Sequence, residues 1–294
     1  MFFRSSSNAA AWFALITIGL AWGGTQILSK IIVQGGHHPI GITLTGTVLG
    51  AVVLTVMMFL TGRRLPLARK DLIFYGICGL LGTALPNSVS YLAYQELPVG
   101  VISIVLAMVP MLTMLGALAI GLERPNGIRL LGLALGAGAV MLLVVPKASL
   151  PEPDQAIWIA LPVITATAYA AENLYLAVSN RTDLDPMQVL CGLFWGALVL
   201  LVPVTASVDG WMLLGEFDRS EWALIATTAL HIVAYGGFVW LIGRAGPVFA
   251  AQVAYVVTLT GVFLGMLFLG EQNSAWVWLS LVAMLGGLAL VRPR

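Results

Sequence analysis

The sequence predicts an all-α integral membrane protein with ten transmembrane helices, arranged as two inverted five-helix repeats around a central cavity. Composition predicts the class: of 294 residues, 60% are hydrophobic and only 9% are charged, whereas soluble domains carry roughly 25% charged residues. Ten separate apolar stretches are each long enough to cross a hydrocarbon core of about 30 Å as a helix. An internal repeat predicts how these helices are organised.

Two long stretches, Leu97–Arg124 and Gly246–Gln272, carry the repeat most clearly. Each begins with a Pro-Val pair and continues for more than twenty residues without a charge. The first then ends on Glu123 and the second on Glu271. A repeat of this length sets the architecture, because each unit must fold as an equivalent structural module.

A second similarity within the chain supports the first. Ala11–Leu28 resembles Ala156–Leu174, and the aromatic residues Trp22 and Tyr169 stand in matching places. The repeat unit is therefore half of the protein.

Ten spans follow from the apolar stretches. In chain order we expect them at about residues 9–30, 39–61, 72–95, 99–121, 128–146, 157–179, 186–205, 221–243, 247–269 and 275–291.

Glycines and prolines modify some of these spans. Small residues let transmembrane helices approach closely, so we expect the fifth and tenth spans to pack against their neighbours or a second subunit. The glycines concerned are Gly132, Gly136, Gly138, Gly286 and Gly287. Proline removes a backbone hydrogen bond and kinks a helix. Such kinks are expected at Pro86, Pro110 and Pro162.

The distribution of lysine and arginine predicts the orientation, because these residues accumulate in cytoplasmic loops. With the N-terminus inside, Lys30, Lys147 and Arg219 are external, and the other eleven of the fourteen are cytoplasmic. Both termini are then cytoplasmic. Each half has five spans, an odd number, so the second repeat (147–294) enters the membrane from the side opposite to the first (1–146). Inverted repeats recur in secondary transporters, although duplication also builds symmetric membrane enzymes and scaffolds.

Several function classes are disfavoured. A net charge of +1 without a basic patch argues against nucleic-acid binding. Cys78 and Cys191 fall within apolar spans and are expected to be buried, not paired. We find no metal-ligand spacing, no phosphate-binding loop and no reactive pair. The sequence therefore predicts no metal, no cofactor and no enzymatic activity.

Glu172 is the only acidic residue well inside a predicted span. A carboxylate is costly in lipid, so it is expected to face a cavity or a partner. Tyr169 and Asn173 lie close to it on the same span. The alternative is a protonated, hydrogen-bonded structural carboxyl group.

The other candidates are polar or aromatic. His231 lies in mid-span with Tyr235 one turn later, where an imidazole can bind a substrate carboxylate, relay protons or simply pack. The remaining residues predict a neutral, aromatic-lined substrate cavity. They are Trp22, Gln26, Asn87, Tyr91, Gln252 and Tyr255.

Together these features resemble the drug/metabolite transporter superfamily, and specifically its EamA-type members with two repeats. The resemblance is carried by Leu122–Arg124, Leu269–Glu271, Trp22–Gly23 and Pro110, and it covers essentially the whole chain. The two halves differ at two of these positions, since Thr258 stands where Pro110 has its counterpart and Ala170 stands where Gly23 has its counterpart.

The resemblance implies a multi-pass protein of the bacterial inner membrane, with a cavity formed by spans 1, 3, 4, 6, 8 and 9. It also implies export of a small-molecule substrate, with YddG-type exporters of aromatic and other amino acids as the nearest type. The alternatives are an exporter of lipophilic cations, with Glu172 as the counter-charge, or a channel or membrane-embedded enzyme. Both a monomer and a homodimer are compatible with the sequence.

Overall fold

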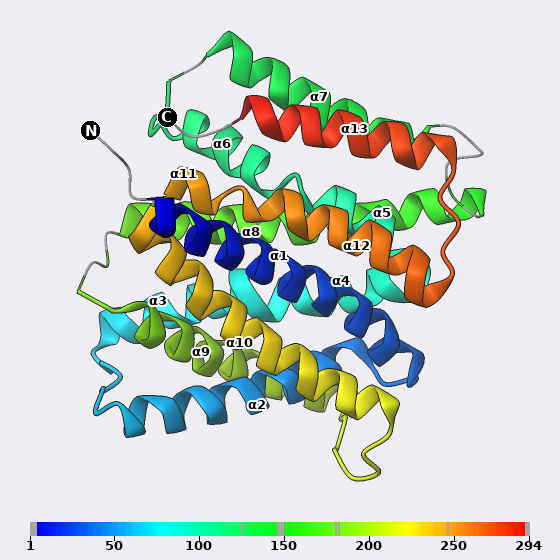
Figure 1. Cartoon of the computed structure of the whole chain (residues 1–294). Coiled ribbons are helices and arrows are strands. Elements are labelled where there is room, and N and C mark those ends of the chain that lie inside the picture. The colour runs from blue at the N-terminus through cyan, green and yellow to red at the C-terminus, as the bar shows by residue number, and fades with distance from the viewer. Residues whose placement is uncertain are drawn as a thin grey trace.

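A computed structural model describes residues 5–124, 126–145, 150, 152–179, 181, 183–245 and 247–291. Within them the fold is entirely helical (Figure 1). The elements are α1 (Ser5–Gln34), α2 (Pro39–Leu60), α3 (Arg69–Gly79), η1 (Leu80–Ala84), α4 (Leu85–Glu96), α5 (Val99–Leu106), α6 (Val109–Ala119), α7 (Gly127–Val144), η2 (Pro153–Ile159), α8 (Ala160–Ser179), α9 (Pro186–Ser207), α10 (Arg219–Ala245), α11 (Pro247–Ala250), α12 (Val253–Leu269) and α13 (Ala275–Leu290).

The helical segments agree with the predicted spans. Eight are long and apolar enough to cross a membrane, and two further apolar helices, α12 and α13, are shorter. The third span is one continuous segment, Arg69–Glu96, and the fourth is Val99–Ala119. Of the cations that predicted the topology, Arg4, Lys147, Arg292 and Arg294 lie outside the described residues.

Three spans are interrupted, two of them where proline predicted it. The third span passes through the π-helical turn η1 just before Pro86, whose missing N–H leaves the carbonyl four residues earlier without its helical partner. The fourth breaks between α5 and α6, directly before Pro110. The ninth breaks between α11 and α12 without a proline.

Pro162 lies just after the junction at which the 3-10 helix η2 passes directly into α8. The kink expected there stays a prediction.

Packing of the helices follows a regular scheme. α1 lies between α10 and α12, whereas α8 lies between α4 and α6. α9 packs on α2 and α3, α2 also contacts α10, and α5 packs on α12. Exchanging spans 1–5 with spans 6–10 leaves this set of pairs unchanged, which is the pattern that two equivalent halves would give. The division at residues 146 and 147 stays a prediction.

α7 and α13 form a separate pair at one edge of the bundle (Figure 1). Gly132 and Gly287 face each other in this pair. A Cβ at either position would lie 2.7 Å from the carbonyl oxygen of the other glycine, so only glycine permits this approach. The close packing expected of the fifth and tenth spans is therefore confirmed.

The helices alternate in direction along the chain. α1 runs from left to right in Figure 1, and after four further crossings α8 runs from right to left. The left end of the bundle carries the loops that we predict to be cytoplasmic, and the right end those that we predict to be external.

Candidate functional site

Glu172 lies on α8, partly buried, opposite the π-helical turn of the third span. The residue that faces it there is Gly82. A Cβ at position 82 would overlap the Glu172 carboxyl group, so glycine makes the space that this group occupies. Single π-turns in long helices are found frequently at functional sites. The two halves thus meet around this carboxylate.

No hydrogen bond or ion pair to Glu172 is recorded among the described residues. Tyr169, Tyr235 and Cys78 are titratable groups within electrostatic range of Glu172. None of these carries a positive charge to balance the carboxylate. A carboxylate inside a membrane protein needs a partner, and here a ligand can supply it.

Tyr169 and Asn87 join the halves beside Glu172. The Tyr169 hydroxyl donates to Asn87 Oδ1 at 2.9 Å, which links α8 to α4. This bond fixes the tyrosine ring one turn before Glu172 on the same helix. The sequence predicted all three residues for the site, and the structure brings them together.

A second cluster lies between α1 and α10. The Trp22 ring is 6.2 Å from the His231 ring and 5.3 Å from the Phe238 ring, measured between centroids. Within the described part of the chain, Trp22 Nε1 is buried without a hydrogen-bond partner, and so is Thr227 Oγ1, one turn before His231. Two donors are thus left without an acceptor, which is uncommon for buried polar groups.

α10 connects the two clusters. Thr227, His231 and Tyr235 are four residues apart on it, and therefore share one face. His231 contacts Trp22 of α1, whereas Tyr235 lies within electrostatic range of Glu172 of α8.

The remaining predicted residues make other contacts, although Tyr91 lies within electrostatic range of Tyr169. Gln26 and Tyr91 are buried in packed regions, and Gln26 Oε1 accepts a hydrogen bond from Ser103 at 2.5 Å. Asn173 is exposed and donates to Thr113 Oγ1 at 3.4 Å. Gln252 is at the break before α12, and Tyr255 packs against the main apolar core.

Residues 9–145 match the family model described as the EamA-like transporter family. These residues form an EamA-like transporter domain. The chain is a membrane transporter that crosses the bilayer many times.

Relatives of this transporter extend the similarity to nearly the whole chain. The uncharacterized inner membrane transporter YedA of Escherichia coli strain K12 is 26% identical over 286 residues, which is 95% of this chain and 89% of YedA. The uncharacterized protein PA1977 of Pseudomonas aeruginosa is 27% identical over 279 residues, 94% of this chain and 92% of PA1977. A solved crystal structure aligns with a TM-score of 0.63 and 17% identity over 96% of both chains, and it shares the fold.

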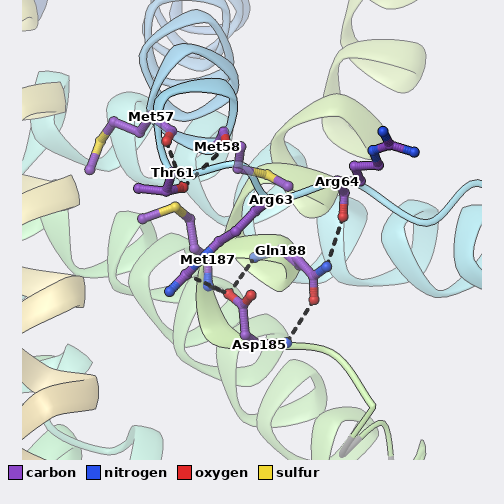
Figure 2. A network of polar contacts seen from close by, with 8 residues as sticks. All are labelled: Met57, Met58, Thr61, Arg63, Arg64, Asp185, Met187 and Gln188. Carbon is purple, nitrogen blue, oxygen red and sulfur yellow. Dashed lines mark hydrogen bonds and ion pairs between the residues drawn. The ribbon is translucent and has the colours of Figure 1, made fainter.

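At the left end of the transporter in Figure 1, polar contacts tie the first half to α9 (Figure 2). Arg63 Nη1 pairs with Asp185 Oδ1 at 3.0 Å, and Gln188 Nε2 donates to the Arg64 carbonyl at 2.7 Å. Asp185 also accepts hydrogen bonds from the first N–H groups of α9, including that of Met187 at 2.8 Å.

Beside this network, Arg181 bridges Asp71 of α3 and Asp183, at 2.5 and 2.8 Å, and lies 5.2 Å from the centre of the Phe74 ring. The Asp183 hydrogen bond raises the pKa of Arg181, and Arg181 in turn lowers the pKa of Asp183. These contacts hold the loops of the two halves together at this end.

A pocket of about 290 Å³ at the opposite end of the bundle contains Gly35, His37 and Glu221. Its carboxylates serve the local fold. Glu221 accepts from the Phe217 N–H at 2.7 Å, and Asp218 accepts from the Glu221 N–H at 2.8 Å. The latter bond, with one from Ser220, lowers the pKa of Asp218.

Reasoning from the sequence missed Gly82, Thr227 and Phe238. The signal for Gly82 was its position four residues before Pro86. Proline has no N–H, so the Gly82 carbonyl loses its usual helical hydrogen-bond donor. The signal for Thr227 was its spacing: it lies four residues before His231, on the helix face that His231 and Tyr235 share.

Proposed function

We propose that this chain is a secondary transporter of the bacterial inner membrane that exports small metabolites carrying an amino group, by alternating access. Amino acids with aromatic or other apolar side chains are the proposed substrates. The observation that carries the proposal is the Glu172 carboxyl group, which has no recorded partner among the described residues. It faces Gly82 of the first half and lies within electrostatic range of Tyr169 and Tyr235 of its own half. The printed name of YedA, an inner membrane transporter, supports the location.

The chemistry of the site suits a substrate ammonium group. A charge-assisted hydrogen bond to a carboxylate is about twice as strong as a neutral one. The rings of Trp22, Tyr235 and Phe238 offer apolar surface and, to a cation, the negative face of an aromatic ring.

The carboxylate of an amino acid would need donors. The indole N–H of Trp22 and the hydroxyl of Thr227 are both buried without an acceptor among the described residues, so a substrate carboxylate would satisfy two groups that these residues leave unpaired.

The interrupted helices support the proposal that substrate passes between the two repeats. In many transporters, substrate sites are formed by discontinuous helices at the interface of inverted repeats. Here the fourth and ninth spans are both discontinuous, and α5 and α12 pack on each other. We therefore propose that the repeats 1–146 and 147–294 rock against each other around the Glu172 site.

A lipophilic cation is the second candidate substrate. It is favoured by the same lone charge, since no cationic side chain is recorded as bonded to Glu172 within the described residues. Such a substrate would leave the donors of Trp22 and Thr227 unused.

Counterflow in proteoliposomes separates these possibilities. The probes are L-tryptophan, tryptamine, which lacks the carboxylate, and indole-3-propionate, which lacks the amino group. We expect tryptophan to exchange and indole-3-propionate not to. Exchange of tryptamine and tetraphenylphosphonium without tryptophan would replace the amino-acid proposal by the cation exporter. Preferred exchange of indole-3-propionate would overturn the role of the carboxylate.

A further inference from the structure

Glu271, at the end of the ninth span, binds the start of the fourth span in the other half. Its Oε1 accepts the Val99 N–H at 2.6 Å and its Oε2 accepts the Gly100 N–H at 3.1 Å. These are two of the N–H groups at the start of α5 that have no partner within that helix. The positive end of the helix dipole strengthens both bonds.

Two glycines direct Glu271 toward α5. Gly270 ends α12 in the left-handed conformation, with φ of 67°, and the Glu271 N–H returns to the Gly265 carbonyl at 3.2 Å. A Cβ at Gly265 would lie 3.1 Å from Cδ of Glu271, so the absence of a side chain there gives the carboxylate room.

Further hydrogen bonds lie on both sides of the bonds between Glu271 and α5. One helical turn farther into the bundle, Ser103 Oγ donates to Gln26 Oε1 at 2.5 Å and to the Val99 carbonyl at 2.8 Å. Toward the loop, Lys30 Nζ donates to the carbonyls of Tyr94 and Leu97 at 2.5 and 3.1 Å. These contacts join α5, α12 and α1 at the end of the bundle that lies on the right in Figure 1.

Glu123 has the corresponding place in the first half but behaves differently. It stands two residues after its left-handed glycine, Gly121 (φ of 76°), whereas Glu271 directly follows Gly270. Its side chain is 47% exposed and pairs with Arg129 of the same half at 3.0 Å. Among the described residues, no hydrogen bond from Glu123 to the ninth span is recorded. One end is therefore joined by its glutamate and the other is not.

We propose that Glu271 is a latch: its bonds to the start of α5 hold this end of the bundle closed, and they must break for the substrate path to open there. Lys30 supports the latch by fixing the turn that leads into α5, and it lies within electrostatic range of Glu271. By our predicted topology this end is external.

Thiol labelling tests the latch without any substrate, and therefore independently of the proposed function. The background is Cys78→Ala with Cys191→Ala, because these are the free cysteines of the chain. Ser103→Cys, a change of one atom, places the reporter behind the latch. A membrane-impermeant maleimide is added on the Glu271 side of the membrane.

With Glu271 present we expect slow labelling, and with Glu271→Ala about tenfold faster labelling, since the rate follows the fraction of open molecules. Glu271→Gln keeps an acceptor oxygen and should fall between the two. Glu123→Ala is the matched control and should not change the rate. Equal rates for the parent and Glu271→Ala, or an equal effect of Glu123→Ala, would overturn the proposal.

A disulfide provides the second measurement. A Cβ at position 100 would lie 3.4 Å from Asn273 Oδ1, so we choose Gly100→Cys and Asn273→Cys as a pair of neighbouring side chains that should form a disulfide when the latch is closed. In the Glu271→Ala background, oxidation should return the reporter to slow labelling, and a reducing agent should release it. Failure of the pair to form, or fast labelling of the oxidised protein, would contradict a closed latch at this place.

Discussion

α1 and α8 hold corresponding places in the two halves, yet of these two helices only α8 carries an acidic side chain in its middle. Trp22 and Tyr169 match in the repeat, and the residue three positions later is Thr25 in α1 and Glu172 in α8. Thr25 Oγ1 donates to the Trp22 carbonyl at 2.7 Å, so its polar group is satisfied within its own helix. Glu172 has no such bond recorded within the described residues.

The helices that face these two positions differ as well. α8 packs on the third span, which contains the π-turn and Gly82, whereas α1 packs on α10, which is uninterrupted from Arg219 to Ala245. Repetition accounts for the arrangement of helices, and the difference between the repeats accounts for the site. The carboxyl group that we propose to bind substrate therefore lies on one side of a nearly symmetric interface.

Removing the charge should have the largest effect. We expect Glu172→Ala to lower transport by about 100-fold, since two charge-assisted hydrogen bonds are lost and each tenfold corresponds to about 1.4 kcal/mol. The Km and maximal rate of exchange in proteoliposomes are the measurement. Thr25→Ala is the matched control at the equivalent position, and it should transport at nearly the parent rate. Similar losses in both variants would show that the comparison between α1 and α8 has no functional meaning.

Filling the space opposite Glu172 should have the next largest effect. The Cβ of Gly82→Ala would overlap the carboxyl group, and overpacking typically costs about 1–3 kcal/mol of stability. We expect a lower thermal unfolding temperature and about tenfold slower transport. Gly76→Ala is the control on the same span, because a Cβ there would meet nothing within 4 Å.

A double variant sharpens this prediction. Adding Glu172→Ala to Gly82→Ala removes the overlap, so the unfolding temperature should recover although transport does not. A stability loss that is unchanged in the double variant would place the clash elsewhere.

The Tyr169–Asn87 bond should contribute least. Tyr169→Phe removes a single hydrogen bond of 2.9 Å, which is worth about 1 kcal/mol. Transport should fall by about fivefold at most, and Asn87→Ala should have a similar effect because it removes the same bond. Their combination should be less than additive, and fully additive losses would mean that the bond does not couple them.

Much of this architecture could be predicted from the sequence, because the length of an apolar stretch and the position of a proline act on the helix in which they occur. The length of the apolar stretches predicted the spans, and Pro86 and Pro110 predicted two of the interruptions. The break before α12 has no proline or other local signal at Ala251–Gln252, so it depends on tertiary packing. Gln26 illustrates the same limit in the site: its depth was predictable, but its bond to Ser103, which is 77 residues away, was not.

The most direct test of the account is Glu172→Gln, compared with the parent for downhill exchange and proton-driven uptake of tryptophan in the same proteoliposomes. The amide keeps the shape of the carboxyl group and one acceptor, but it cannot carry the charge that binds an ammonium group. We expect a partial loss of about tenfold in exchange, in line with one charge-assisted hydrogen bond. Loss of proton-driven uptake alone, with exchange intact, would assign Glu172 to proton relay and not to substrate binding. A Gln variant equal to the parent in both measurements would contradict the central role of this carboxylate.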